Sequence, residues 1–284
     1  MRQLTDISQE REATSTIVDL TRAFEGISSM RISKIKDQVQ QSEAYFAELW
    51  KIYTQLRVSE NFHFGRGQSA GKIINKELLI MITSEGSFSG DIDERLVDKS
   101  LVHYKPKDND IIVIGHHGAI QLAQRGVEYA RSFKLPSKDL NINVAPLSEQ
   151  IQKYLSTVVF YPAYISLMTQ DIRSIKLSNA VTERGKGVVA GEEIISEQNY
   201  IFEPSTHAVV DHLERSMMQV ALSEVILEAK LAQYASRFKA MNIAHHKASE
   251  SLSGLNMVYN RTKRNIKDER IREITNGLRG AQKR

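Results

Sequence analysis

The stretch ITSEGSFSGDID, residues 82–93, holds the residue types from which phosphate loops and serine active sites are built. A phosphate loop needs a lysine that this stretch lacks, and the dinucleotide fingerprint G-x-G-x-x-G is also absent. A nucleophile elbow needs serine at the centre of G-x-S-x-G, whereas GSFSG has Phe88 there, between Ser87 and Ser89. An α/β hydrolase with Ser87 or Ser89 as its nucleophile is therefore an alternative that the motif does not favour.

The histidine pairs are the other candidates for chemistry. His116 and His117 follow a predicted strand, and neighbouring residues on an extended chain point in opposite directions, so we interpret them as a polar turn. His245 and His246 lie on a predicted helix without the i,i+4 spacing of a helical metal pair. The chain contains no cysteine, which removes thiolate nucleophiles and zinc–thiolate sites. We expect no metal and no cofactor.

Composition sets the class of protein. The 284 residues are 41% hydrophobic and 25% charged, and the net charge of +4 is too small by itself to indicate a nucleic-acid partner. The sequence has no apolar run near the ~18 residues that a membrane helix needs. The first residues, MRQLTDISQERE, carry acids and no apolar core, which is unlike a targeting peptide. We expect a protein that faces the cytoplasm and has no direct membrane span.

Long helices are predicted at both ends, because all five prolines lie between positions 106 and 204. A heptad seam with alternating spacings of four and three predicts one coiled-coil helix from about 206 to 276. Its members are Leu213, Met217, Val220, Glu224, Leu227, Leu231, Tyr234, Phe238, Met241, His245, Ala248, Leu252, Leu255, Tyr259, Thr262 and Ile266.

The N-terminal helix has a similar pattern with one irregularity. Its expected seam runs through Ile17, Leu20, Phe24 and Ile27, then through a stutter at Arg31, which locally unwinds a supercoil. The seam then resumes at Ile35, Val39, Ser42, Phe46, Leu49, Tyr53 and Leu56. We expect the two helices to pair antiparallel, with the longer C-terminal helix extending beyond the pair.

The middle of the chain reads as a small α/β domain. KELLIMITS and DNDIIVIG are typical of buried strands, with a helix between them in DIDERLVDKSLVHY, and this order predicts a largely parallel sheet. APLSEQIQKYLSTVVF is predicted as a second helix, residues 163–203 as extended chain turned at RGKG (184–187), and residues 57–76 as a linker.

The predicted fold is thus a long antiparallel coiled coil with a central Rossmann-like α/β domain. We expect an N-terminal helix over 1–60, a linker and α/β domain over 61–204, and a C-terminal helix over 205–284.

Several stretches together resemble one family, the gamma subunit of F-type ATP synthases. The matching stretches are LTRAFEGISSMRISK (20–34), ITSEGSFSGDID, DIIVIGHHG, YIFEPS (200–205), SRFKAMNIAHHKAS and LNMVYNRTKRNIKDERIREITNG. The chain departs from the family pattern at Gly86, Phe88, Ser89 and Asp91, at His116 and His117, at Lys263 and Arg264, and at Asp268, Glu269 and Arg270.

The resemblance implies a non-catalytic rotor shaft, present once per complex inside a ring of three alpha and three beta subunits. Its base would contact the epsilon subunit and the membrane c-subunit ring, at the cytoplasmic face of a bacterial cell membrane. Ion flow, of protons or sodium, would turn the shaft and drive ATP synthesis. The stretch 82–93 would then be a structural loop of the globular part, lying against the shaft.

The resemblance also suggests which residues meet the stator. These are Arg22, Arg31 and Lys34 in the N-terminal signature and Lys263, Arg264 and Arg270 in the C-terminal one. Residues 261–284 contain nine Lys or Arg against three Asp or Glu, which suits a contact with acidic loops. A free-standing coiled-coil adaptor that forms homo-oligomers through the seam is the alternative.

Overall fold

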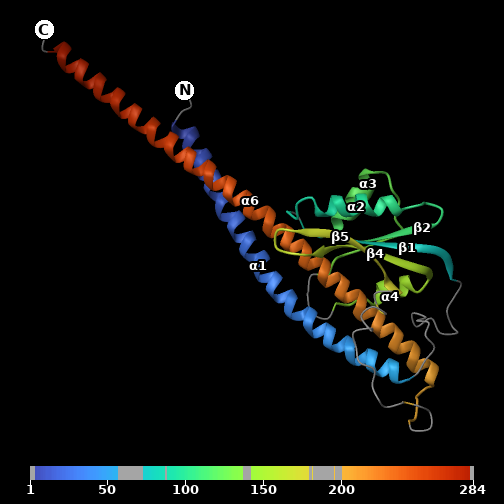
Figure 1. The fold of residues 1–284 in the computed structure, drawn as a ribbon. Coiled ribbons are helices and arrows are strands. Elements are labelled where there is room, and N and C mark those ends of the chain that lie inside the picture. The colour runs from blue at the N-terminus through green and yellow to red at the C-terminus, as the bar shows by residue number, and fades with distance from the viewer. Residues whose placement is uncertain are drawn as a thin grey trace. The chain divides into compact units, whose positions relative to one another are not determined.

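The computed structural model describes the chain over residues 4–56, 73–86, 88–136, 142–178, 181, 195 and 200–281. The contacts divide it into two compact units, residues 28–237 and residues 1–27 together with 238–284. Two long helices contribute to both units, α1 (Leu4–Gln55, blue) and α6 (Thr206–Ala281, orange to red) (Figure 1). Most of the expected linker and the RGKG turn lie outside the described residues.

The larger unit contains one five-stranded sheet in the order β3-β2-β1-β4-β5. Its strands are β1 (Ile74–Ile82), β2 (Asn109–Ile114), β3 (Arg131–Phe133), β4 (Tyr154–Tyr164) and β5 (Gln170–Lys176). All neighbouring pairs are parallel except β4 and β5, which are antiparallel. The prediction of a largely parallel sheet is confirmed.

Strand β1 lies at the centre of the sheet, and its side chains contribute to the apolar core on each face. Leu78, Ile80 and Ile82 belong to the apolar core on one face, and Leu79 and Met81 belong to the core on the other. This alternation follows from the two-residue period of a strand, and both faces are apolar because both are covered. The whole run is consequently hydrophobic, which made this strand readable in the sequence.

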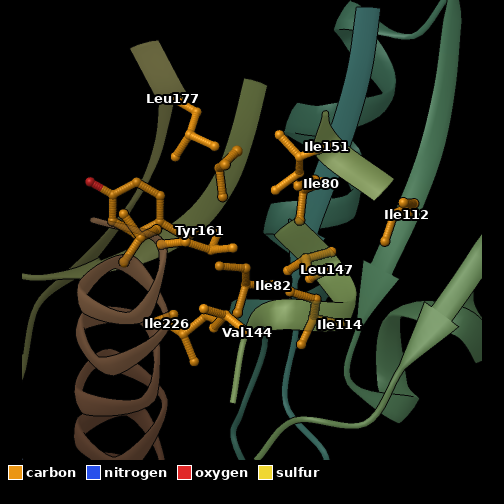
Figure 2. Close-up of a cluster of buried hydrophobic side chains, with 14 of the residues drawn as sticks. Ile80, Ile82, Ile112, Ile114, Val144, Leu147, Ile151, Tyr161, Leu177 and Ile226 are labelled. Atoms are coloured by element: carbon orange, nitrogen blue, oxygen red, sulfur yellow. The ribbon is translucent and has the colours of Figure 1, made fainter. Parts of the chain in front are cut away.

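Helices cover both faces of the sheet. The first face packs against α4 (Ala145–Ile151) and α6, and the second against α2 (Ile92–His103) and α3 (His116–Gln124) (Figure 1). Figure 2 shows Ile226 of α6 among the side chains of β1 and α4 on the first face. The middle of α6 is thus part of the core of the larger unit.

Two predictions in this region are wrong. The helix expected over 145–160 ends at Ile151, and the chain continues as strand β4, because β-branched and aromatic side chains from Tyr154 onward suit a buried strand. His116 and His117 do not form a strand-end turn but the first residues of α3. Short apolar runs do not by themselves separate helix from strand.

In the smaller unit, α1 and α6 run antiparallel. Thr21 Oγ1 lies 3.4 Å from His245 Nδ1, and Asn242 donates a 3.0 Å hydrogen bond to Glu25. Farther toward the start of α1, the Arg11 guanidinium lies 4.5 Å from the ring centroid of Tyr259. Later α1 residues therefore meet earlier α6 residues. Residues 263–278 of α6 are all exposed within this unit, as expected for the longer helix.

The expected N-terminal seam is wrong before Arg31 at three of its four members, and the fourth, Phe24, is half-buried. Ile17, Leu20 and Ile27 are 50%, 53% and 46% exposed, while Thr21 is buried and Val18 is half-buried. The covered residues keep one heptad phase, so no stutter is needed. The apolar residues Ile17, Leu20 and Ile27 are thus exposed while the polar Thr21 is covered, which the pattern of hydrophobicity could not reveal.

Across the described parts of the chain, no helix is both long enough and apolar enough to cross a membrane.

Candidate functional site

The basic end of α6 is the first candidate surface. Lys263, Arg264 and Arg270 are all exposed in the smaller unit, as the sequence suggested. Lys263 Nζ lies 5.8 Å from the ring centroid of Tyr259, whose ring also contacts Arg11. A cation near an aromatic ring gains a modest attraction at an exposed site. These contacts hold the start of the basic stretch near the end of the helix pair.

The N-terminal basic residues are divided between the two units. Arg22 is exposed in the smaller unit, and Lys34 is exposed and Arg31 half-buried in the larger one. The same stretch of α1 also carries an exposed apolar stripe of Ile17, Leu20 and Ile27, on another side of the helix from Arg22 because consecutive residues turn by about 100°. The charged stator contact that the resemblance suggested is thus accompanied here by an apolar surface that sequence reasoning placed in the seam.

The predicted C-terminal seam residues are covered in each unit. In the larger unit Leu213, Met217, Leu227 and Leu231 are buried. In the smaller unit Met241 is buried, and Phe238, Leu252, Leu255 and Tyr259 are half-buried. Burial thus decreases along the helix toward the basic end, which agrees with the loss of a partner helix there.

The second candidate is a buried polar cluster around Asp93, which is 3% exposed in the side chain. Its Oδ1 accepts a 2.9 Å hydrogen bond from the Ser84 amide. Its Oδ2 accepts from the hydroxyls of Ser84 and of Ser89, the latter at 3.1 Å, and lies 3.1 Å from His117 Nδ1. We call Ser84, Ser89, Asp93 and His117 the Asp93 hub.

Three separate elements bring the hub together. Ser84 and Ser89 follow strand β1, Asp93 lies in the first turn of α2, and His117 lies in the first turn of α3. The parallel strands β1 and β2 end at the same edge of the sheet, so the loops that follow them meet there. Ser84, Ser89 and Asp93 all lie in the stretch 82–93, but sequence reasoning missed the hub because nothing in the sequence joined them to His117, which lies 24 residues after Asp93.

The backbones of Gly115 and Thr83 approach closely at the same edge of the sheet, where β2 and β1 end. Gly115 has a φ of 100°, and a Cβ there would lie 2.1 Å from the Thr83 carbonyl oxygen, so only glycine fits. The Thr83 hydroxyl accepts a 3.0 Å hydrogen bond from the Gly118 amide and donates to the Ile114 carbonyl. The ends of β1 and β2 are therefore held by directed contacts as well as by the apolar core.

The hub is not a catalytic triad. In a triad, histidine uses one ring nitrogen for serine and the other for aspartate, whereas His117 Nδ1 lies 3.2 Å from Ser84 and 3.1 Å from Asp93. Ser84 and Ser89 are 1% and 3% exposed, so no substrate reaches them. Ser87 lies outside the described residues. The proposal that Ser89 is a nucleophile has no support in this geometry.

The loop that carries the hub rests on α6, within the larger unit. Ser236 donates a 2.6 Å hydrogen bond to the Ser89 carbonyl, and Arg237 donates a 3.4 Å hydrogen bond to the Gly86 carbonyl. Burial lowers the pKa of Arg237 from its ordinary value, and Tyr234 and Asp93 partly oppose this. The expected structural role of residues 82–93 agrees with these contacts.

Buried polar groups also join α6 to other elements of the larger unit. Tyr53 of α1 donates a 3.1 Å hydrogen bond to Glu214, and Lys230 donates a 2.7 Å hydrogen bond to the Pro136 carbonyl. Glu214 and Lys230 are 1% and 2% exposed. Among the described residues, no three His, Asp or Glu side chains are grouped as a metal ion would require.

Comparison with known proteins identifies a family. The sequence model of the family described as ATP synthase matches residues 3–280. The ATP synthase gamma chain of Cytophaga hutchinsonii is 23% identical over 98% of both chains. That of Chlorobaculum tepidum is 24% identical, again over 98% of both. A solved rotor of the Euglena gracilis mitochondrial ATP synthase is similar in fold, with a TM-score of 0.58, 15% identity and coverage of 92% of this chain and 99% of that one.

Proposed function

The chain belongs to the ATP synthase family, and we propose that it is the gamma subunit, the central rotor shaft that couples ion flow to ATP synthesis or hydrolysis. The match to the family along residues 3–280 carries this proposal. It is supported by relatives that are named ATP synthase gamma chain and match over 98% of both chains.

The shape of the individual parts suits such a shaft. Two helices packed through a seam resist twisting better than one, and α6 is anchored in the core of the larger unit. The basic end of α6 is exposed and charged. Exposed ion pairs are weak, so contacts that this end makes with a surrounding ring would break easily as the shaft turns. The stripe of Ile17, Leu20 and Ile27 offers an apolar surface for the interior of a surrounding ring.

We assign no catalytic step to this chain. The described residues contain a hub whose serines are buried and no grouped metal ligands. Nucleotide chemistry would belong to the ring of three alpha and three beta subunits. We expect the purified chain to bind no ATP, since the sequence has no phosphate-cradling motif. Isothermal calorimetry would contradict this expectation if it detected stoichiometric binding at micromolar ATP.

The partners and location follow from the same proposal. One copy would assemble with three alpha, three beta and one epsilon subunit on a membrane ring of c subunits. The complex would lie at the cytoplasmic face of a bacterial inner membrane, with this chain bound peripherally.

Affinity purification of the tagged chain from its native cells tests the assembly, with native mass spectrometry to count the subunits. The proposal expects one copy of this chain with three alpha and three beta subunits. A homo-oligomer of the chain without a ring would support the adaptor instead and contradict the rotor.

A further inference from the structure

A rotor needs a fixed angle between the element that receives the turning force and the helix that delivers it. In the larger unit, the sheet meets α6 mainly through apolar side chains such as Met218, Leu222 and Ile226. Apolar burial is strong but not directional, so it resists separation better than it resists rotation. The alanines of α6 that face the sheet domain, Ala229 and Ala232, have no side chain long enough to interlock deeply.

Directed contacts gather at one loop of this interface, in addition to the bond from Lys230 to the Pro136 carbonyl. Ser236 and Arg237 are consecutive on α6 and bond two different carbonyls of one loop, those of Ser89 and Gly86. Consecutive helical residues point about 100° apart around the helix axis, since one turn holds about 3.6 residues. The loop therefore holds the helix from two directions, which opposes rotation in either sense.

The loop can do this only if it is itself fixed to the sheet. The Asp93 hub provides that fixation, because one buried carboxyl group bonds Ser84 on one side of the loop and Ser89 on the other. His117 adds a link to α3 through Asp93 Oδ2 and through its own amide, which donates to the Ser84 carbonyl at 3.2 Å. Hydrogen bonds to a carboxylate are among the stronger ones in proteins.

The glycine at position 86 completes the arrangement. A Cβ there would lie 3.2 Å from Arg237 Nη2, so the guanidinium occupies the space that a side chain at this position would need. Gly86 is one of the positions where this chain departs from the pattern it resembles. Arg237 of α6 thus covers the loop in place of a side chain from the loop itself.

We propose that the Asp93 hub, together with Ser236 and Arg237, is a torsional clamp that fixes the sheet at one angle on α6 and so transmits torque between them. This proposal rests on the proposed rotor function. Asp93 is a positioning residue in it, and it acts through the loop.

Two variants test the clamp from opposite sides. Asp93→Ala removes the hub, and the double variant Ser236→Ala with Arg237→Met removes the two bonds from α6 to the loop while leaving the hub intact. The matched control is Asp98→Ala on the same helix as Asp93. Asp98 is 59% exposed in its side chain, and its 2.7 Å ion pair with Arg125 joins α2 to the turn after α3.

The first readout is geometric and uses the chain in the assembled complex. The chain has no cysteine, so spin labels can be placed at Arg95→Cys on α2 and His212→Cys on α6, both exposed in the larger unit. We expect a broader distance distribution in Asp93→Ala and in the double variant than in wild type or Asp98→Ala. The second readout is the ratio of ions pumped to ATP hydrolysed in vesicles, which should fall below half in both variants while ATPase activity persists.

The outcomes separate the clamp from the function on which it rests. If wild type pumps ions and both clamp variants match Asp98→Ala in distance distribution and pumping ratio, the clamp is refuted and the rotor function stands. If the wild-type chain supports no pumping in a complete complex, the rotor function itself fails. Broadening and uncoupling in the double variant support the clamp even if Asp93→Ala does not assemble.

Discussion

The hydroxyl of Tyr53 on α1 donates a 3.1 Å hydrogen bond to Glu214 on α6, and the two residues are 9% and 1% exposed. Burial, followed by the nearby Glu214, raises the pKa of Tyr53 above its ordinary value. This contact ties the end of the first long helix to the start of the second by a directed bond within an apolar cluster that includes Phe46 and Met217.

Tyr53→Phe should therefore destabilise the chain. The variant leaves a buried carboxyl group without this donor, which costs about 1–3 kcal/mol when the group is not otherwise compensated. The free energy of unfolding in urea measures the loss. Tyr45→Phe is the matched control, because Tyr45 is 58% exposed on the same helix and its change should stay within about 0.5 kcal/mol. Equal effects of the two variants would show that the contact contributes nothing.

Alkaline pH should weaken the fold through Tyr154. Burial, and then its hydrogen bond to Asp110, raises the pKa of Tyr154 to about 12. The unfolded chain has a tyrosine pKa of about 10, so between these values the folded state holds the proton that the unfolded state loses. The stabilisation is complete below pH ~10 and disappears as pH rises toward ~12.

Unfolding in urea at a series of pH values measures this loss, with Tyr154→Phe beside the wild type. The variant lacks the titrating group, so its stability should decline less steeply over that interval, even though it starts lower at neutral pH. Parallel curves for the two proteins would mean that Tyr154 does not cause the decline.

The basic end of α6 should act collectively. Lys263, Arg264 and Arg270 are all exposed, and an exposed ion pair contributes only ~0.2–1 kcal/mol, so no single one is expected to dominate. Changing all three to Gln should reduce ion pumping per ATP hydrolysed and leave assembly intact, whereas each single change should have little effect. Lys239→Gln with Lys247→Gln, which removes charge from the paired part of α6, serves as the control.

Vesicle pumping assays would contradict this distributed account in either of two ways. One single variant could uncouple pumping from hydrolysis as fully as the triple variant, which would show that one residue makes a specific contact that transmits torque. Alternatively, the triple variant could behave as wild type, in which case the shape of the shaft alone carries the torque.

The sequence predicted the parts of this protein that depend on regular patterns. The seam from Leu213 onward repeats strictly, and strand β1 is buried on both faces, so hydrophobicity alone located both. The hydrophobic pattern failed on α1. There a heptad series can start at Ile17 or at Val18, and only the packing decides which series faces α6. It failed again at Tyr154, where strand β4 begins inside an apparent helical pattern.

The Asp93 hub shows a different limit. Ser84 and Asp93 are close in the chain, but His117 comes from another helix and no local spacing connects it to them. Their meeting depends on two parallel strands ending at one edge of the sheet and on Gly115 allowing the backbones to touch. The residue types in ITSEGSFSGDID (82–93) marked this stretch as a candidate site. That the stretch instead has a structural role could be seen only from the fold.

Rotation of the chain against its ring tests the account most directly. A single cysteine in place of the exposed Lys107 can carry a bead in an otherwise cysteine-free chain, with the alpha and beta subunits fixed to glass. The account predicts that ATP drives the bead in one direction, in repeated steps that match the threefold ring. A bead that stays still while the same immobilised complexes hydrolyse ATP would contradict the claim that this chain is the rotor.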